Sequence, residues 1–540
     1  MSSARDHDGN ATARRARPAN SKSVLSVPLQ KAIEEAQPKL FSWGMMRLYS
    51  CMLVAMMIAW ANGYDGGLMS GISAMPQYQK YFGAELTGSK TAITFAIYFI
   101  GSLIGAPITG PLSDTLGRRW GMAVGCGVIC MGACVQGSAT NSHAFLGGRF
   151  FCGIGICLSQ SSAVTYVAEI AHPAWRSAFT SMFNTFYFVG AFVVSWVTYA
   201  TLNITGEYSW RLPIYFQCVA CGIVLFTAPF LPESPRWLIA HGKRDAAVAM
   251  LTKYHGDGDA HSPIVQLELE ELDRAISLEG HDKVWWDYRP LFTTHEARWR
   301  SLCAVSMAFI GQWAGNGAIT YFLPAMLDQA GVHSPRTQLL YNAIVNTIAY
   351  PCGAFSALFI AGQMGRRKLM ISALCVFCVE YIIITALAAT FSPENADGSS
   401  SFAAGSRATV AMIIIFRLTY SFTITPIHPV YPVECFAYET RAKGEGLFTI
   451  MDGAASVFNT YATPVGLGAV GWKFYLLYVA WDAVVPLWIY FMCVETHGRT
   501  LEELTEIFRA PNPVKASLVA REVEVIDNGD VMEVVIKDDV

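Results

Sequence analysis

The chain has 540 residues, of which 53% are hydrophobic and only 15% are charged, and its mean hydropathy is +0.35. A soluble protein of this size needs far more charge to cover its surface. The net charge of −3 argues against a nucleic-acid-binding protein, which requires a basic face, so the composition favours a protein embedded in a lipid bilayer.

Residues 1–44 are polar and rich in Arg and Ser, which predicts a disordered cytosolic N-terminal tail, and no cleavable signal peptide is visible. Apolar segments follow with about 20 residues each, the length that a helix needs to cross a bilayer core. Twelve such spans occur, at 45–63, 91–112, 120–139, 145–168, 178–201, 212–231, 301–324, 338–361, 369–390, 408–431, 447–469 and 472–493.

A long polar stretch divides these spans six and six. We therefore expect an N-terminal six-helix bundle (45–238), a cytosolic linker with short helices (239–298), a C-terminal six-helix bundle (299–494) and a cytosolic C-terminal tail (495–540). Within span 4, four glycines at 147, 148, 153 and 155 predict close helix packing, because no strand precedes them as a nucleotide-binding fingerprint requires.

Basic residues in the short loops predict the orientation of the chain, since such loops remain in the cytosol. They follow spans 2, 4, 8 and 10, which places both termini and the linker on the cytosolic side. The residues are Arg118, Arg119, Arg176, Arg366, Arg367, Lys368, Arg441 and Lys443. The glycosylation sequon at Asn203 lies in the loop after span 5, on the predicted outer side.

The two halves carry matching signals, which indicates an internal duplication. Gly117-Arg118-Arg119 closes span 2 and Gly365-Arg366-Arg367 closes span 8. An acid precedes an arginine by seven residues after span 4 and again after span 10. Two related six-helix halves predict a binding site near the bilayer midplane, between them.

Several motifs resemble the sugar porter family of the major facilitator superfamily over about residues 45–505. They are Gly110–Arg119, Tyr166, Glu169-Ile170-Ala171, Pro232–Arg236 and Glu495–Glu503. Gly311–Pro324 and Arg441–Gly444 are most similar to the fungal lactose permease and cellodextrin transporter branch. The resemblance implies an all-α fold with twelve transmembrane helices in two pseudo-symmetric bundles. It also implies alternating access and uptake of a disaccharide such as lactose or cellobiose at the plasma membrane.

Acidic residues at the predicted cytosolic helix ends lie close in sequence to arginines. The expected pairs are Asp114–Arg118, Glu169–Arg176, Glu233–Arg236, Glu434–Arg441 and Glu495–Arg499. Such pairs can form when the cytosolic side closes and separate when it opens, which predicts a gate. The alternative is a set of interfacial charges that contribute little individually.

Two charges lie within the predicted spans of the first half. Asp65 falls at the outer end of span 1, and Arg149 falls early in span 4. Charges at such depth are usually functional, because they cost several kcal/mol unless paired. In proton-coupled sugar porters an acid of span 1 lies near an arginine of span 4, which implies that a proton on Asp65 weakens its pairing with Arg149. The alternative is a permanent structural pair in a facilitator.

Sugar binding requires amide side chains and aromatic faces. The resemblance assigns this role to Asn184, Gln312, Tyr321 and Asn346, and we add Asn316 and Asn459 for their polarity, with helix–helix hydrogen bonding as the alternative for each. Gly311 and Gly317 stand where the family has larger polar residues, which predicts a roomier cavity. His428 lies between Pro426 and Pro429 in a helix that we expect to be broken, and Asp452 and Glu380 remain open cases.

No nucleophile, metal or phosphate motif supports an enzyme, and the 14 cysteines lie in apolar stretches that suit small buried side chains. We predict no cofactor and no metal. The expected partners are a sugar, a proton and the bilayer. The alternatives are a facilitator or carrier of another polar metabolite and a sugar sensor that does not transport.

Overall fold

The computed structural model describes residues 42–518, apart from 257, 280–286, 360–362, 392–399, 438–439, 498 and 500, together with two strands near the C-terminus. For a few further residues, Asn184 among them, only the backbone is described. The predicted N-terminal tail therefore lies almost entirely outside the described residues.

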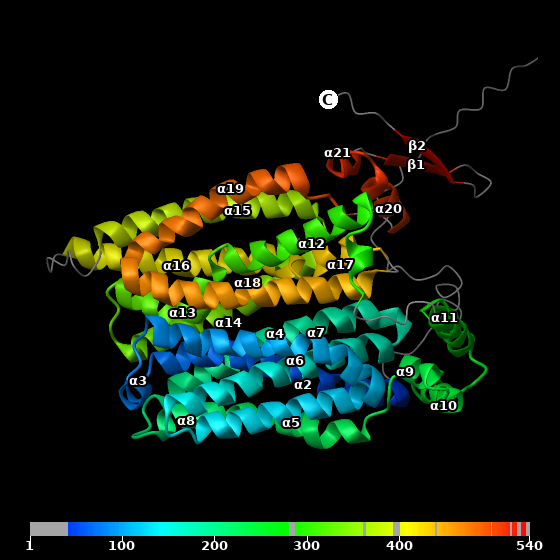
Figure 1. Cartoon of the computed structure of the whole chain (residues 1–540), viewed down its shortest axis with the longest axis horizontal. Coiled ribbons are helices and arrows are strands. Elements are labelled where there is room, and N and C mark those ends of the chain that lie inside the picture. The colour runs from blue at the N-terminus through cyan, green and yellow to red at the C-terminus, as the bar shows by residue number, and fades with distance from the viewer. Residues whose placement is uncertain are drawn as a thin grey trace, which may run out of the picture.

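Helices cover all six predicted spans of the first half (Figure 1). They are α2 (Trp43–Ser73), α4 (Ser89–Leu116), α5 (Arg118–Gly137), α6 (Ser142–Ile170), α7 (Arg176–Thr201) and α8 (Tyr208–Thr227), with the short α3 (Pro76–Phe82), η1 (Pro173–Trp175) and η2 (Ala228–Phe230). The sequence had suggested that Asp65 lies at the outer end of span 1. Because α2 continues to Ser73, Asp65 instead lies inside the helix.

The second half contains the other six spans, two of which are broken. Its helices are α12 (His295–Trp313), α13 (Asn316–Gln329), α14 (Pro335–Phe359), α15 (Arg366–Thr390), α16 (Ser400–Ile427), α17 (Val430–Cys435), α18 (Arg441–Val470), η5 (Gly471–Phe474) and α19 (Tyr475–Met492). Span 7 is divided between α12 and α13, and span 10 breaks at His428-Pro429, as the flanking prolines predicted.

Eight stretches within the described residues are long and apolar enough to cross a membrane, and the last of them contains both α18 and α19. The predicted spans outside these stretches belong to α7, to α12 with α13, and to α14. The last three carry polar residues such as Gln312, Asn316 and Asn346, which lower their hydropathy. The twelve-helix, all-α membrane fold predicted from the sequence is confirmed.

Short elements connect and follow the two halves. The linker contains α9 (Pro235–Ala240), α10 (Arg244–Tyr254), α11 (Pro263–Glu279) and η3 (Arg289–Leu291). After the last span come α20 (Leu501–Arg509), α21 (Pro513–Ser517) and an antiparallel hairpin of β1 (Arg521–Val525) and β2 (Val531–Val535), which the sequence analysis did not predict. Arg300 of α12 donates to Thr505 Oγ1 at 3.2 Å, so α20 is attached to the second half.

Figure 1 shows the two halves as layers, the first below and the second above. We call the end of the bundle with α9–α11, α20 and α21 the linker face, and the opposite end, with α3, the far face. Across the halves, α4 packs on α18, α7 on α14 and α2 on α13. These contacts hold the functional residues of span 7 against the first half.

The span 4 glycines pack closely against neighbouring helices, as predicted. A Cβ atom on Gly153 would lie 2.0 Å from the carbonyl oxygen of Tyr98 in α4, and one on Gly148 would lie 2.6 Å from the backbone nitrogen of Gln136 in α5. Gly147 is the exception, with open space around it. Backbones in membranes approach this closely only where the side chain is absent or very small.

Candidate functional site between the two halves

The break in span 7 places a helix start inside the bundle. Gly315 adopts φ +82°, and its carbonyl oxygen accepts a hydrogen bond from the Tyr381 hydroxyl at 2.9 Å. A Cβ atom at this position would lie 2.2 Å from the Tyr381 ring, so glycine is required both for the backbone conformation and for the space. Helix α13 therefore begins at Asn316, where the positive end of its dipole lies.

Three polar side chains meet beside this break. Gln312 Nε2 donates to Asp452 Oδ1 at 3.0 Å, and His428 Nε2 lies 3.4 Å from the same oxygen. The side chains of His428 and Asp452 are 21% and 27% exposed. The structure thus joins Gln312, a predicted substrate residue, to two residues whose roles the sequence had left open.

The two glycines of span 7 do not enlarge a cavity, and that expectation was wrong. A Cβ atom on Gly311 would lie 2.1 Å from the His428 ring, and one on Gly317 would lie 1.9 Å from Asn459 Nδ2. The missing side chains make room for other residues of the same half. The argument for a larger substrate from these positions therefore fails.

Asn459 is a buried residue whose amide is engaged within the second half. Its Nδ2 donates to the Gln312 carbonyl oxygen at 2.8 Å, and its Oδ1 accepts from Thr463 at 2.9 Å. It is 5% exposed. These contacts support the helix–helix alternative stated above, because they hold α18 against the end of α12.

Asn316 contacts a charge that the sequence analysis missed. Its Oδ1 accepts hydrogen bonds from Thr320 Oγ1 at 3.2 Å and from Arg417 of α16. Arg417 is buried, and it lies within predicted span 10. A charge inside an apolar span was the signal that could have identified it.

Tyr321 and Asn346 lie where the halves meet. The Tyr321 ring is 5.8 Å from that of Phe99 in α4, measured between centroids. Asn346 of α14 donates to Ser195 Oγ of α7 at 2.8 Å. The side chain of Asn184, also predicted to bind substrate, lies outside the described residues.

Asp65 and Arg149 form a direct ion pair. Arg149 Nη1 lies 2.8 Å from Asp65 Oδ1, and the two side chains are 3% and 1% exposed, respectively. The guanidinium carbon lies 4.8 Å from the centroid of the Tyr98 ring. Asp65 Oδ2 is buried and has no hydrogen-bond partner among the described residues. The carboxylate therefore depends on a single arginine for its charge compensation.

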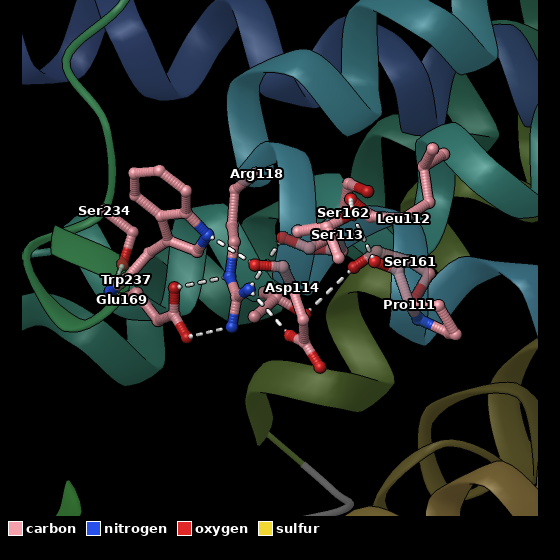
Figure 2. Close-up of polar contacts among 12 residues, drawn as sticks. Pro111, Leu112, Ser113, Asp114, Arg118, Ser161, Ser162, Glu169, Ser234 and Trp237 are labelled. Carbon is pink, nitrogen blue, oxygen red and sulfur yellow. Dashed lines mark hydrogen bonds and ion pairs between the residues drawn. The ribbon is translucent and has the colours of Figure 1, made fainter. Parts of the chain in front are cut away.

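At the linker face, Arg118 is the centre of a cluster in the first half (Figure 2). It contacts Asp114 at 3.0 Å and Glu169 at 3.1 Å. Glu233 Oε1 accepts the backbone N–H of Arg118 at 3.0 Å, and Arg119 Nε lies 3.5 Å from Glu233 Oε2. Burial raises the pKa of Glu233, although these N–H groups and Arg119 oppose the shift.

The second half repeats two contacts of this cluster, although Gly362 stands where the first half has Asp114. Arg366 contacts Glu434 at 3.0 Å, as Arg118 contacts Glu169. Glu495 Oε1 accepts the backbone N–H of Arg366 at 2.7 Å, as Glu233 accepts that of Arg118. The duplication inferred from sequence is thus visible in the side-chain contacts.

Of the five pairs expected from sequence spacing, Asp114–Arg118 forms in this structure. Among the described residues, Glu169 and Glu434 contact the side chains of Arg118 and Arg366, and Glu233 and Glu495 accept the backbone N–H groups of those two arginines. The pairs of these acids with Arg176, Arg236, Arg441 and Arg499 stay predictions for a state closed to the cytosol. The arginines that begin α5 and α15 contact these acids in place of the expected arginines, because both helix starts lie beside the acids of the neighbouring spans. Arg499 instead lies 4.0 Å from Glu503 and donates to the Ser517 carbonyl oxygen at 3.3 Å.

Arg176 contacts the linker. It lies 3.5 Å from Glu268 of α11, whose carboxylate also contacts His255 of α10. His255 Nε2 is 3.1 Å from the Ile170 carbonyl oxygen at the end of α6. Beside it, burial and the neighbouring His255 lower the pKa of His172 to about 4. The linker helices are thus attached to the first half.

Each ion pair described at the linker face joins elements of one half or its attached linker, whereas hydrogen bonds between the halves lie toward the far face. Trp196 Nε1 donates to Thr347 Oγ1 at 3.2 Å, and the Gly88 N–H donates to the Pro464 carbonyl oxygen at 3.0 Å. Asn203, the predicted glycosylation site, is exposed in the loop between α7 and α8.

A family model described as sugar (and other) transporter matches residues 51–508. The chain belongs to this family. The MFS-type transporter oryC of Aspergillus oryzae is 28% identical over 460 residues, covering 84% of this chain and 83% of that protein. High-affinity glucose transporter 1 of Candida albicans is 25% identical, covering 84% of each. The xylose transporter XylE from E. coli, in an inward open conformation, matches with a TM-score of 0.69 and 19% identity, covering 85% of this chain and 99% of that one.

The protein is therefore a sugar transporter of the major facilitator superfamily and a multi-pass integral membrane protein. Its relatives are transporters, which agrees with the prediction that the chain is not an enzyme. The sugar porter family inferred from the motifs is confirmed. The narrower assignment to the lactose permease and cellodextrin branch stays a prediction.

Proposed function

We propose that the protein takes up a sugar together with a proton across the plasma membrane, by alternating access, with the linker face and both termini in the cytosol. The observation that carries this proposal is the arrangement of contacts between and within the halves. The halves are bonded to each other toward the far face, while the linker-face clusters of Arg118 and Arg366 each stay within one half. This arrangement suits a state that is closed to the outside.

The linker-face clusters act as a gate in this proposal. Asp114, Arg118, Glu169 and Glu233 form the first-half part, and Glu434 and Glu495, with Arg366, form the second-half part. Because their charges are partly desolvated, a rearrangement that brings the halves together changes their hydrogen bonds and favours one state by a few kcal/mol. Arg176, Arg236 and Arg441 lie in the first turns of α7, α9 and α18, and Arg499 follows α19. Arg176 connects the gate to the linker through Glu268.

Proton coupling is assigned to Asp65 and Arg149. A proton on Asp65 would remove the charge that compensates Arg149 and would weaken a contact between α2 and α6. Uptake driven by the proton gradient follows if α2 can rearrange around the sugar only in that protonated state. The 2.8 Å pair in a buried setting supports this assignment.

The sugar contacts are assigned to Gln312, Asn316, Tyr321 and Asn346 at the interface between the halves, with Asn184 as a further ligand from α7. Asn459 positions Gln312, because its Nδ2 donates a hydrogen bond to the backbone carbonyl oxygen of Gln312. The resemblance to the lactose permease and cellodextrin branch favours a disaccharide such as lactose or cellobiose as the substrate.

The test is uptake by cells that lack their own sugar transporters and express the full chain. Labelled glucose, xylose, lactose and cellobiose are supplied in turn while an electrode records the pH of the medium. Uptake with alkalinisation, abolished by an uncoupler, supports the proposal. Uptake that an uncoupler leaves unchanged contradicts the proton coupling, and a lack of uptake of both disaccharides contradicts the assigned substrate.

A second candidate is a carrier of another polar metabolite on the same scaffold. The observation that favours it is Arg417, a buried charge beside Asn316 at the proposed sugar site. A neutral sugar has no need of a full positive charge in its site.

A further inference from the structure

Arg417 lies deep in the bundle without a carboxylate partner. It stands in α16 (Ser400–Ile427), ten residues before the helix ends, and is 7% exposed. Among the described residues no acidic oxygen lies within 4 Å of it, whereas Arg149 of the first half lies 2.8 Å from Asp65. A charged side chain inside the membrane is costly and is retained where it has a function.

Most of the hydrogen-bonding capacity of Arg417 is unused within the described protein. A guanidinium has five N–H donors in a planar fork, and here Nη1 donates to Asn316 Oδ1. Among the described residues the other nitrogens have no acceptor, and, unlike Arg149 Nε, they are not among the fully buried polar atoms without a partner. The free part of the fork is therefore accessible to a small acceptor.

The surroundings place this guanidinium at the proposed sugar site. Tyr187, Tyr321 and Tyr420 lie in the neighbourhood of the guanidinium, and Tyr187 belongs to α7 of the first half. Its partner Asn316 is the first residue of α13, a helix of 14 residues. The positive end of the α13 dipole thus reinforces the charge of Arg417 at the same place.

None of the membrane-embedded acids of the second half forms an ion pair with Arg417 among the described residues; Asp482 of α19 is buried, and both of its carboxylate oxygens lack a hydrogen-bond partner there. Asp452 is bound by Gln312 and by His428, and Glu380 of α15 accepts a hydrogen bond from Thr419 at 2.8 Å. Neither is in contact with Arg417. The interface between the halves therefore carries a positive charge that an anion of the right size would neutralise.

We propose that Arg417, with Asn316 and the N-terminus of α13, binds the carboxylate of a sugar acid, so that the transporter prefers an acidic sugar to its neutral counterpart. This inference rests on the proposed function, because it uses the same site between the halves. Arg recognises a carboxylate through paired N–H donors, and such charge-assisted bonds are about twice as strong as neutral ones. The hydroxyl groups of the same solute would contact Gln312 and Asn346.

The experiment uses full-length protein reconstituted in liposomes and two matched pairs of labelled solutes: glucose with glucuronate, and lactose with lactobionate. Wild type is expected to take up at least one acid with a KM about tenfold or more below that of its neutral partner. Arg417→Gln is expected to raise the KM for the acid about 10–100-fold and to change the KM for the neutral sugar much less, so that the preference for the acid is lost. Arg417→Lys keeps the charge but lacks the planar fork of N–H donors, so its KM for the acid is expected to lie between those of wild type and Arg417→Gln.

Glu380→Gln is the matched control, because it removes a membrane-embedded charge beside α16 that does not contact Asn316; it is expected to keep the wild-type preference. Thermal stabilisation of the detergent-solubilised protein by glucuronate or lactobionate gives a second readout that does not depend on turnover. Uptake of neutral sugars alone, with Arg417→Gln unchanged, would overturn the inference and leave the sugar transporter intact. Failure of all four solutes to enter would count against both proposals.

Discussion

Asp65 is buried and pairs with one arginine, so protonation of its carboxylate would weaken one contact between α2 and α6. Its Oδ1 contacts Arg149, while Oδ2 has no partner among the described residues. An acid with one free oxygen can accept a proton without losing a second hydrogen bond. This is the physical basis for assigning proton coupling to it.

We expect Asp65→Asn to abolish accumulation against a gradient while downhill exchange persists, because the amide cannot carry the proton. The single substitution also leaves Arg149 buried and unpaired, which costs about 3–5 kcal/mol of stability. The double variant Asp65→Asn with Arg149→Gln removes both charges and should recover much of that stability without recovering accumulation. Uptake with and without an uncoupler, beside thermal unfolding, measures both effects. Continued accumulation by Asp65→Asn would show that another group carries the proton.

His172 gives the protein a pH-dependent stability outside the membrane. Its pKa is lowered from 6.5 to about 4 by burial and by His255. The unfolded chain therefore binds a proton at a higher pH than the folded one, so this contribution is complete above pH 6.5 and is lost as the pH falls toward 4. While only the unfolded state is protonated, the loss approaches about 1.4 kcal/mol per pH unit.

His172→Asn keeps an acceptor for the Ala174 N–H, which His172 Nδ1 accepts at 3.3 Å, but does not titrate. Thermal unfolding of both proteins between about pH 7.5 and pH 5 should show a shallower decline for the variant. Parallel curves would mean that His172 titrates equally in both states.

At the scale of elements, glycines determine how closely the helices of the first half pack against one another. Span 4 was predicted to pack closely, and the structure shows which glycine contacts which neighbour: Gly153 the Tyr98 carbonyl oxygen, and Gly148 the backbone of Gln136. Gly147 has no neighbour within 4 Å. Residues of one type in one helix therefore have different roles, which no spacing rule distinguishes.

The matched pair Gly153→Ala and Gly147→Ala tests this difference. Gly153→Ala forces α4 and α6 apart and should cost about 1–3 kcal/mol. Gly147→Ala meets nothing and should be neutral or slightly stabilising, since alanine is the better helix former by about 1 kcal/mol. Thermal unfolding in detergent and the yield of monodisperse protein measure both. Equal effects of the two substitutions would contradict the packing described for α6.

Element boundaries could be predicted where the composition changes sharply. The prediction failed where a polar residue inside a helix is paired with a residue of another helix. The sequence Tyr64-Asp65-Gly66-Gly67 reads as the end of a span, yet α2 continues because Arg149 neutralises Asp65. The break at His428 was predictable, since two prolines flank it. The β1–β2 hairpin was missed although Glu522-Val523-Glu524-Val525 alternates and Asn528-Gly529 is a typical hairpin-turn sequence, because the tail was interpreted from its acidic composition alone.

At the scale of the whole molecule, the number of spans, the duplication and the family could be predicted, because each of them depends on a pattern of many residues. The partners of the gate could not, because sequence distance is a poor guide to contacts between helices: Arg118 contacts Glu169, 51 residues away. Arg417 could have been identified as a charge inside an apolar span, whereas its contact with Asn316, 101 residues away, could not.

The central claim is that the two halves must separate at the far face for a solute to enter. Thr87 and Gly468 lie on opposite halves there, and a Cβ atom on Gly468 would be 3.5 Å from that of Thr87, within the range for a disulfide. The measurement is sugar uptake by Thr87→Cys with Gly468→Cys before and after oxidation, with each single variant and the wild type as controls. The account predicts that the cross-link stops uptake in the double variant alone and that a reductant restores it. Undiminished uptake by fully cross-linked protein would contradict it.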